Sequence, residues 1–228
     1  MSIQQILLGS GVPIELAKYV DEVFSTYLYD GNGADKTITN GIDLAGKGGL
    51  TWIKRRYPSS ANHALVDTER GASQYISSNS NAANIGTGAN NNFNSFTSTG
   101  FTLKNDSGSD IFNNENSTYA SWSFRKAKGF FDIQEYSSSS SNTSGSIGNP
   151  NFQVNHDLGC VPGMILIKRT DGTNDWFAWV RGKEGVLNSS GTLFASGALP
   201  LANVTSTYFK FAQGNGCLLY TSPSPRDS

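Results

Sequence analysis

The chain has 228 residues and a formal net charge of −1, with 37% hydrophobic and 15% charged residues. This balance excludes the basic surface that recruits nucleic acid, so we expect no nucleic-acid partner. No apolar run approaches the roughly 18 to 20 residues of a spanning helix, so we expect no membrane insertion. Aromatic residues reach 11%, and small polar residues and glycine are abundant. Such a composition is typical of short strands joined by polar turns.

The first predicted element is a helix over residues 12–23. Pro13 suits a first helical turn, and apolar residues follow at helical spacing, namely Leu16, Tyr19, Val20 and Val23. This helix either packs on the first group of strands or contacts other copies or a larger particle during assembly. The residues before it lack the basic stretch of a signal peptide, so we expect synthesis in the cytoplasm.

From Phe24 onward, apolar residues recur with period two between turn signals, which predicts antiparallel strands. In TYASWSFRK, which begins at Thr118, one row of alternate residues is Ala, Trp and Phe and the other is Ser, Ser and Arg. We expect the first row to face the core and the second to face water. Asn79–Asn94 and Ser137–Ser146 are low in complexity and are predicted as long loops.

One block of sequence returns later in the chain, which predicts an internal duplication. GGLTWIKRR, Gly48–Arg56, is repeated as PGMILIKRT, Pro162–Thr170. Four further pairs of blocks follow the same order: residues 24–29 with 130–136, 37–44 with 151–158, 63–71 with 175–182, and 96–103 with 204–211. The predicted fold is therefore all-β, with two tandem antiparallel β-sandwich or jelly-roll-like units behind a short N-terminal helix.

The repeat also suggests how the chain divides. We assign residues 1–23 to an N-terminal segment with a short helix, 24–129 to the first unit and 130–216 to the second, incomplete unit. The second unit has no counterpart of the TYASWSF strand, so we expect it to be truncated and to leave an unpaired edge. Residues 217–228 begin with CLLYTSPSPRD, which resembles the translation of an adapter used in transposase-based sequencing libraries. We interpret this last segment as foreign to the gene.

Two clusters are candidates for binding a glycan. In DTERG, Asp67 and Glu69 share one face of a strand, a geometry that suits a sugar hydroxyl, a calcium ion or glycosidase chemistry; the alternative is an ion-paired turn. Around Phe177, strand alternation brings at least one tryptophan ring to the surface unless both faces are covered. An exposed tryptophan stacks on sugar rings, whereas core packing or an intersubunit contact are the alternatives. The candidate glycan-binding residues are Asp67, Glu69, Arg70, Trp176 and Trp179.

The remaining motifs predict no chemistry. His63 and His156 do not occupy equivalent positions in the repeat, and we interpret both as surface or turn histidines. Asn105–Asp110 lacks the glutamate that closes a calcium-binding EF-hand loop, and GTGANNN lacks the strand and helix that flank a phosphate loop. We therefore expect no catalytic residue, no cofactor, no metal and no enzymatic activity.

The blocks WIKRR, DTERG, STGFTL, YASWSFRKAKGFFD and HDLGCVPGMILIKRT together resemble a repeat family of unknown function in marine bacteriophages, whose members are often labelled tail or fibre proteins. The resemblance covers roughly residues 1–216 and implies a virion component whose partners are other virion proteins and a host-surface glycan. The common symmetry of fibres suggests a homotrimer. A secreted bacterial adhesin or carbohydrate-binding module, and a glycan-degrading enzyme, remain the alternatives.

Overall fold

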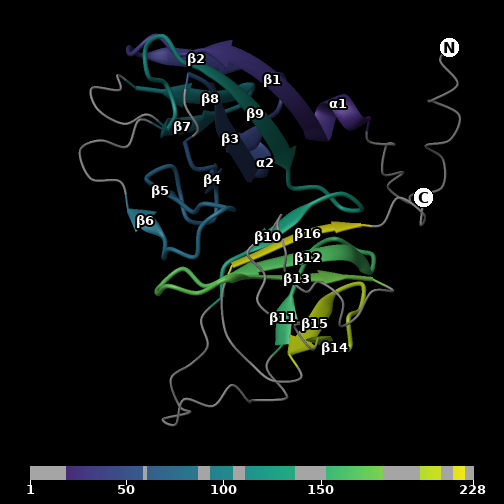
Figure 1. Cartoon of the computed structure of the whole chain (residues 1–228). Coiled ribbons are helices and arrows are strands. Elements are labelled where there is room, and N and C mark those ends of the chain that lie inside the picture. The colour runs from purple at the N-terminus through teal and green to yellow at the C-terminus, as the bar shows by residue number, and fades with distance from the viewer. Residues whose placement is uncertain are drawn as a thin grey trace, which may run out of the picture.

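A computed structural model describes residues 19–58, 61–86, 93–104, 111–136, 153–181, 201–211 and 218–223. Within these ranges the chain consists mainly of strands, and the paired strands run antiparallel (Figure 1). The all-β class predicted from the composition and periodicity is therefore confirmed. No helix in these ranges is long and apolar enough to cross a membrane.

The first unit is a sandwich of two sheets. Sheet A has the order β1-β9-β3-β4 and contains β1 (Phe24–Asp30), β9 (Thr118–Arg125), β3 (Gly49–Tyr57) and β4 (Ala64–Asp67). Sheet B has the order β2-β8-β7 and contains β2 (Lys36–Thr39), β8 (Gly100–Leu103) and β7 (Phe93–Thr97). Shorter elements complete the unit: α1 (Val20–Val23), α2 (Leu44–Lys47), β5 (Gln74–Tyr75) and β6 (Ile85–Gly86).

The second unit repeats this arrangement strand for strand. Sheet C has the order β10-β16-β12-β13 and contains β10 (Asp132–Gln134), β16 (Leu218–Pro223), β12 (Pro162–Lys168) and β13 (Trp176–Val180). Sheet D has the order β11-β15-β14 and contains β11 (Gln153–Asn155), β15 (Tyr208–Phe211) and β14 (Leu201–Ala202). The blocks that repeat in the sequence fall on strands with the same place in the two topologies. The duplication therefore extends from the sequence to the fold.

The unpaired edge expected in the second unit is a wrong prediction for this chain. Leu218–Pro223 forms β16, which pairs with β10 on one side and β12 on the other, in the place that β9 takes in the first unit. A gap between two strands offers unpaired backbone N–H and C=O groups on both sides. The segment LLYTS, with tyrosine and threonine, has the composition that suits a strand in such a gap.

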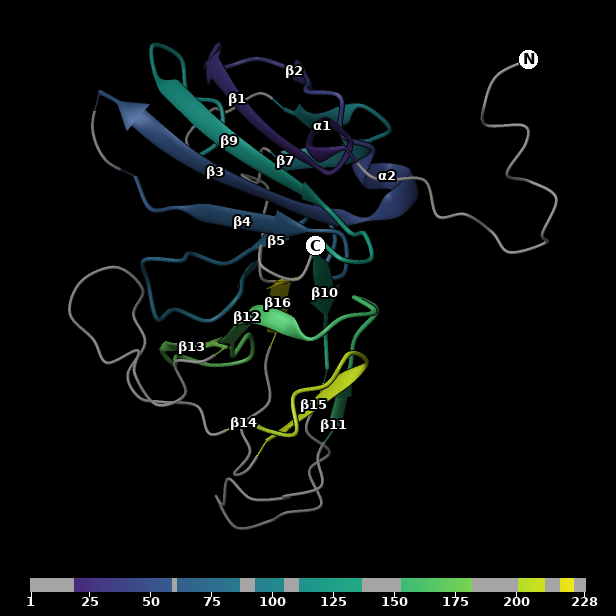
Figure 2. The same ribbon diagram turned by 90° about the vertical axis from the view of Figure 1, so that its right-hand side faces the viewer.

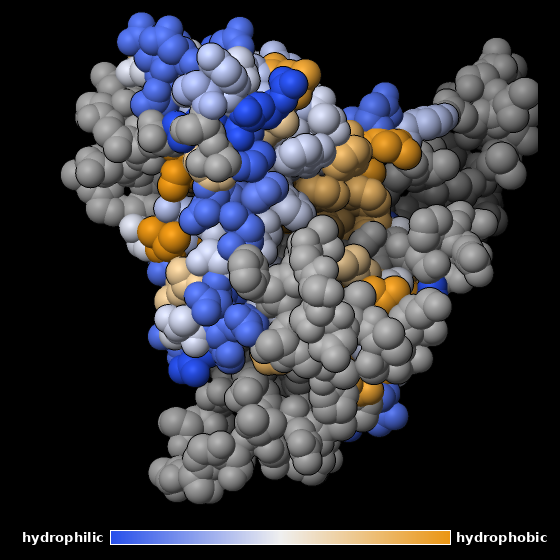
Figure 3. Space-filling model, in the orientation of Figure 1, coloured by the Kyte–Doolittle hydropathy of each residue, from blue (hydrophilic) through white to orange (hydrophobic). Residues whose placement is uncertain are grey.

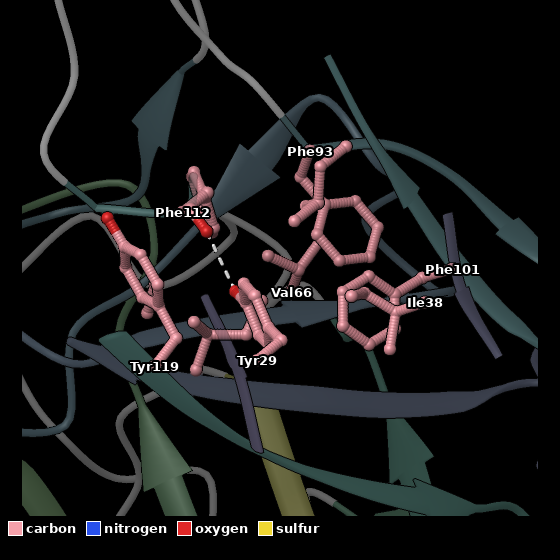
Figure 4. Packing of buried hydrophobic residues seen from close by; sticks show 10 residues of the cluster. Tyr29, Ile38, Val66, Phe93, Phe101, Phe112 and Tyr119 are labelled. Carbon is pink, nitrogen blue, oxygen red and sulfur yellow. Dashed lines mark hydrogen bonds between the residues drawn. The ribbon is translucent and has the colours of Figure 1, made fainter. Parts of the chain in front are cut away.

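Aromatic rings fill the core between sheets A and B (Figure 4). Phe93 stacks on Phe101 with ring centroids 5.3 Å apart, and Tyr29 stacks on Tyr119 at 5.0 Å. The Tyr29 hydroxyl donates a hydrogen bond of 2.7 Å to the carbonyl oxygen of Phe112, so this buried polar group is paired. Such ring pairs each add about 1 kcal/mol beyond the area they bury.

The glycine that opens the first repeated block is required by close packing. Gly49 has a φ of +158°, and a Cβ at this position would lie 2.2 Å from the carbonyl oxygen of Phe124. Any other residue would push β3 away from β9, which is its neighbour in sheet A. Gly49 therefore marks the place where β3 approaches β9 closely.

The alternation predicted for β9 is present, but its two faces are exchanged. Ser121 and Ser123 are fully buried between the sheets, whereas Trp122 and Phe124 lie half-buried on the outer face of sheet A. Asn40 Nδ2 donates to Ser123 Oγ at 2.8 Å, which compensates the burial of the hydroxyl. The small serines leave room for the connection after β2, and the large rings take the other face.

One hydrophobic cluster joins the two units. It combines residues of the first unit and the second: Leu50, Leu65, Ile76, Phe131, Ile133 and Trp176. Two backbone hydrogen bonds reinforce it, from Asn84 N to Thr170 O at 2.8 Å and from Asn174 N to Asn81 O at 2.9 Å. Part of the segment predicted as a long polar loop therefore binds the β12–β13 hairpin. Figures 1 and 2 show sheet C next to the first unit and sheet D on its far side.

The N-terminal helix is short in the part of the chain that the structure describes. α1 covers only Val20–Val23, and the rest of the predicted helix, like the predicted loops 105–110 and 137–146, lies outside the described residues. Val23 is buried, whereas Tyr19 and Val20 are exposed. Figure 3 shows hydrophobic residues gathered over α1 and the adjoining ends of β1 and β9.

Candidate functional site

The charged cluster after β4 forms an ion-paired turn. Asp67 is fully buried, and its Oδ1 accepts hydrogen bonds from the backbone N–H groups of Glu69 (3.1 Å) and Arg70 (3.0 Å). Its Oδ2 accepts from Arg70 Nε at 2.8 Å, and Arg70 also donates to the carbonyl oxygen of Leu65. Because both oxygens of Asp67 bind groups of its own turn, this carboxylate stabilises the end of β4.

Glu69 points to a different partner. Its carboxylate lies 2.8 Å from Lys126 Nζ, and the same ammonium lies 3.3 Å from Asp132, which begins β10. Burial lowers the pKa of Lys126, but the hydrogen bond to Glu69 and the charge of Asp132 outweigh it and raise the pKa above its ordinary range. Lys126 therefore links two carboxylates across the connection between the units, while Asp67 and Glu69 do not form a shared site.

The two candidate tryptophans are buried, because both faces of β13 are covered. Trp176 is 1% exposed, lies in the cluster between the units, and donates from Nε1 to the carbonyl oxygen of Ser77 at 2.9 Å. Trp179 is 7% exposed and packs in the core of the second unit. Sheet C lies between the first unit and sheet D, so the condition under which neither ring reaches the surface is met, and the core-packing alternative applies to both. The five candidate residues therefore do not converge on one surface.

Tryptophan side chains reach solvent instead on the outer face of sheet A, onto which Figure 2 looks. Trp52 on β3 lies directly opposite Trp122 on β9, with ring centroids 6.2 Å apart and planes at 72°. Both rings are half-buried, and Leu28 in the adjacent row of β1 is 59% exposed. Trp52 Nε1 donates to His63 Nδ1 at 2.8 Å, which fixes the indole. We call Trp52, Trp122, Leu28 and His63 the tryptophan surface.

Hydrogen bonds among the polar groups around Trp52 hold these groups in place. Burial, together with the nearby charge of Lys54, lowers the pKa of His63, so the imidazole is neutral at neutral pH. Because its Nδ1 accepts from Trp52, the proton of the neutral ring lies on Nε2. Asn79 accepts from the backbone N–H of His63 and donates to Asn62, both at 3.0 Å. The tryptophan surface thus adjoins fixed hydrogen-bonding groups.

The strand registers explain why sequence reasoning missed this surface. In the second unit, Lys168 on β12 pairs with Trp176 on β13. In the first unit, Lys54 occupies the position equivalent to Lys168 and lies beside Ala61–His63, so His63 takes the place of Trp176. The second unit buries this face against the first unit. In the first unit, Trp52 packs against the edge of the cluster that joins the units and stays partly exposed. Trp52 and Trp122 were visible in the alternating pattern, but the pattern did not indicate which face meets solvent.

His156 is buried, contrary to its interpretation as a surface or turn histidine. It is 4% exposed, its backbone N–H donates to Thr207 O, and its Nε2 lies 3.2 Å from the carbonyl oxygen of Thr205. Burial lowers the pKa of His156, although Thr205 and the charges of Asp132 and Asp157 act in the opposite direction. The ring is therefore held neutral in the folded chain.

We expect His156 to make the fold sensitive to acid. Since its pKa in the folded chain lies below the ordinary value of 6.5, the unfolded chain binds the proton more readily. The free energy of unfolding should therefore fall as the pH decreases below about 6.5, until the folded pKa is passed. Urea unfolding of wild type and His156→Gln at about pH 7 and about pH 5 measures this. An unchanged pH dependence in His156→Gln would contradict it.

The fold and the surface define a class: an all-β protein of two duplicated sandwich units that carries a half-exposed tryptophan pair on the first unit. Residues 20–216 match a family model described as a domain of unknown function (DUF7483), and the chain belongs to this family. No curated protein and no solved structure matches the chain significantly.

Proposed function

We propose that the protein is a structural component of a bacteriophage virion, in its tail or tail fibre, that attaches to a host-surface glycan through the tryptophan surface. The observation that carries the binding role is the half-exposed pair Trp52 and Trp122 beside the fixed polar groups of His63 and Asn79. Indole rings stack on the apolar faces of sugars, and nearby donors and acceptors select hydroxyl groups. The virion assignment rests on the sequence resemblance, with other virion proteins as partners and a homo-oligomer as its expected assembly.

A secreted bacterial adhesin or carbohydrate-binding module is the second candidate, because it would use the same surface. The genes beside this one distinguish the two: tail or packaging genes support the virion, and secretion genes support the adhesin. A glycan-degrading enzyme is less well supported. Asp67 and Glu69, the carboxylate pair predicted for that role, are each engaged by a cation, Arg70 and Lys126.

Replacing Trp122 by alanine should weaken glycan binding by about fivefold or more, because the loss of one stacking ring costs about 1 kcal/mol or more. An array of bacterial surface glycans identifies a ligand for the full chain, and titration calorimetry compares the variants with wild type. Tyr57→Ala is the matched control, because Tyr57 is an exposed aromatic residue at the end of β3, outside the tryptophan surface. Equal binding by wild type and Trp122→Ala would exclude this surface, and binding to no glycan would reject the attachment role.

We also propose that residues 217–228 derive from a sequencing adapter. Their sequence supports this, and the family match ends at residue 216, directly before them. β16 would then occupy the place of a native strand with the role of β9. An independent sequencing read across the gene tests the proposal, and recovery of the same twelve residues would overturn it.

A further inference from the structure

β1 is the edge strand of sheet A and is lined with exposed apolar side chains. β9 pairs with one of its edges, and no described strand pairs with the other. Among the described residues, the exposed large hydrophobic side chains are Tyr19, Val20, Tyr27, Leu28 and Tyr57. All but Tyr57 lie on β1, on α1 or, for Tyr19, directly before α1. The exposed apolar residues of the first unit therefore gather along this one edge.

The backbone of β1 presents hydrogen-bonding groups on its open side. Ser121 Oγ on β9 donates to the carbonyl oxygen of Tyr27, and the N–H of Gly31 donates to Ser117 O, so odd-numbered residues direct these groups toward β9. In an antiparallel pair the direction alternates along the strand. The N–H and C=O groups of Thr26 and Leu28 therefore point to the open edge.

The usual protection of an edge strand is missing from β1. Its sequence, FSTYLYD, contains no proline, lysine or arginine, and its one charge is at the end. The opposite edge of sheet A differs, because Leu65 on β4 exchanges two backbone hydrogen bonds with Ile76. The counterpart of β1 in the second unit, β10, has only three residues, two of them polar. An open edge of seven residues that has no proline, no basic residue and no described segment bonded to it is suited to strand addition.

We propose that a second copy of this chain adds its own β1 to this edge, so that two sheets A join as one continuous antiparallel sheet across a twofold axis. The strand is self-complementary about Tyr27. Pairing Thr26 with Leu28 of the copy uses the outward backbone groups of both residues and brings the two Tyr27 side chains together. Aromatic pairs across strands stabilise a sheet, and the terminal Asp30 meets Phe24 of the copy rather than a like charge. The association does not require glycan binding, although Leu28 belongs to both this interface and the tryptophan surface.

Size-exclusion chromatography with light scattering measures the oligomeric state of the full chain, and we expect a dimer. Thr26→Pro removes an N–H that points to the open edge and should leave the β9 ladder intact, and Leu28→Lys places a charge in the interface. We expect both to weaken association by about tenfold or more, whereas Tyr57→Lys, an equally exposed control, should not. Unchanged circular dichroism shows that the variants fold.

A cross-link tests the register. Tyr27 faces its own copy in a non-hydrogen-bonded pair, where Cα atoms lie about 4.5 Å apart, within the range of a disulfide. Tyr27→Cys should therefore form a covalent dimer on oxidation, and Tyr57→Cys, with the same native cysteines, should not. A monomeric or trimeric wild type, a dimer unaffected by Thr26→Pro and Leu28→Lys, or pairing of β1 only with another protein would overturn the proposal.

Discussion

Trp176→Ala is expected to reduce the free energy of unfolding by about 4 kcal/mol, which lies within the range found when a buried tryptophan or phenylalanine is replaced by alanine. Trp176 is among the largest fully buried side chains, and it lies between the units rather than inside one. Its removal would open a cavity beside Leu65 and Ile133 and leave the carbonyl oxygen of Ser77 without its donor. A loss of this size would remove a large part of the stability of an ordinary domain.

The position of Trp176 also predicts how the variant unfolds. Because the cluster couples the two units, wild type should unfold in one urea transition, whereas Trp176→Ala should show two transitions as the units separate. Trp176→Phe is the matched variant, since it keeps a six-membered ring and loses the rest of the indole together with the hydrogen bond to Ser77; the hydrogen bond accounts for about 1 to 2 kcal/mol of the loss. If alanine cost no more than phenylalanine, the cluster would not be a major source of stability.

The duplicated fold could be predicted because it follows from patterns that are visible in the sequence. The glycine at the start of each repeated strand and the period-two alternation are properties of neighbouring residues, and the order of the repeated blocks is visible when the two halves of the sequence are compared. Gly49 shows the physical basis, since its position against Phe124 O leaves no room for a side chain. Such constraints act within one sheet, so the sequence carries them directly.

The site could not be predicted, because it depends on how the sheets pack. Alternation separates Trp122 from Ser121 and Ser123, but it does not state which row is buried. The same strand position holds His63 at a half-open face in the first unit and Trp176 in the contact between units in the second. The exposure of an aromatic residue is therefore decided by contacts between units that are distant in sequence.

Asp67→Ala is expected to cost about 3 to 5 kcal/mol, because it leaves the Arg70 guanidinium buried without its carboxylate. The side chains of both residues are almost completely buried, and Arg70 also donates to Asn84 Oδ1 at 3.0 Å, which ties the turn to the residue before β6. Glu69→Ala is the matched control. Its ion pair with Lys126 is partly exposed, so its loss should cost less than about 1 kcal/mol.

A double-mutant cycle of Asp67→Ala and Arg70→Ala, followed by urea unfolding, separates the pair from its surroundings. We expect a coupling energy of about 2 to 3 kcal/mol, since each single variant strands the other partner. The cycle also separates stability from binding. Because Asp67 lies in the turn and away from solvent, the folded fraction of Asp67→Ala should bind glycan as wild type does. If the folded fraction of Asp67→Ala bound glycan more weakly than wild type, Asp67 would be a ligand-contacting residue, and the argument for the tryptophan surface would fail.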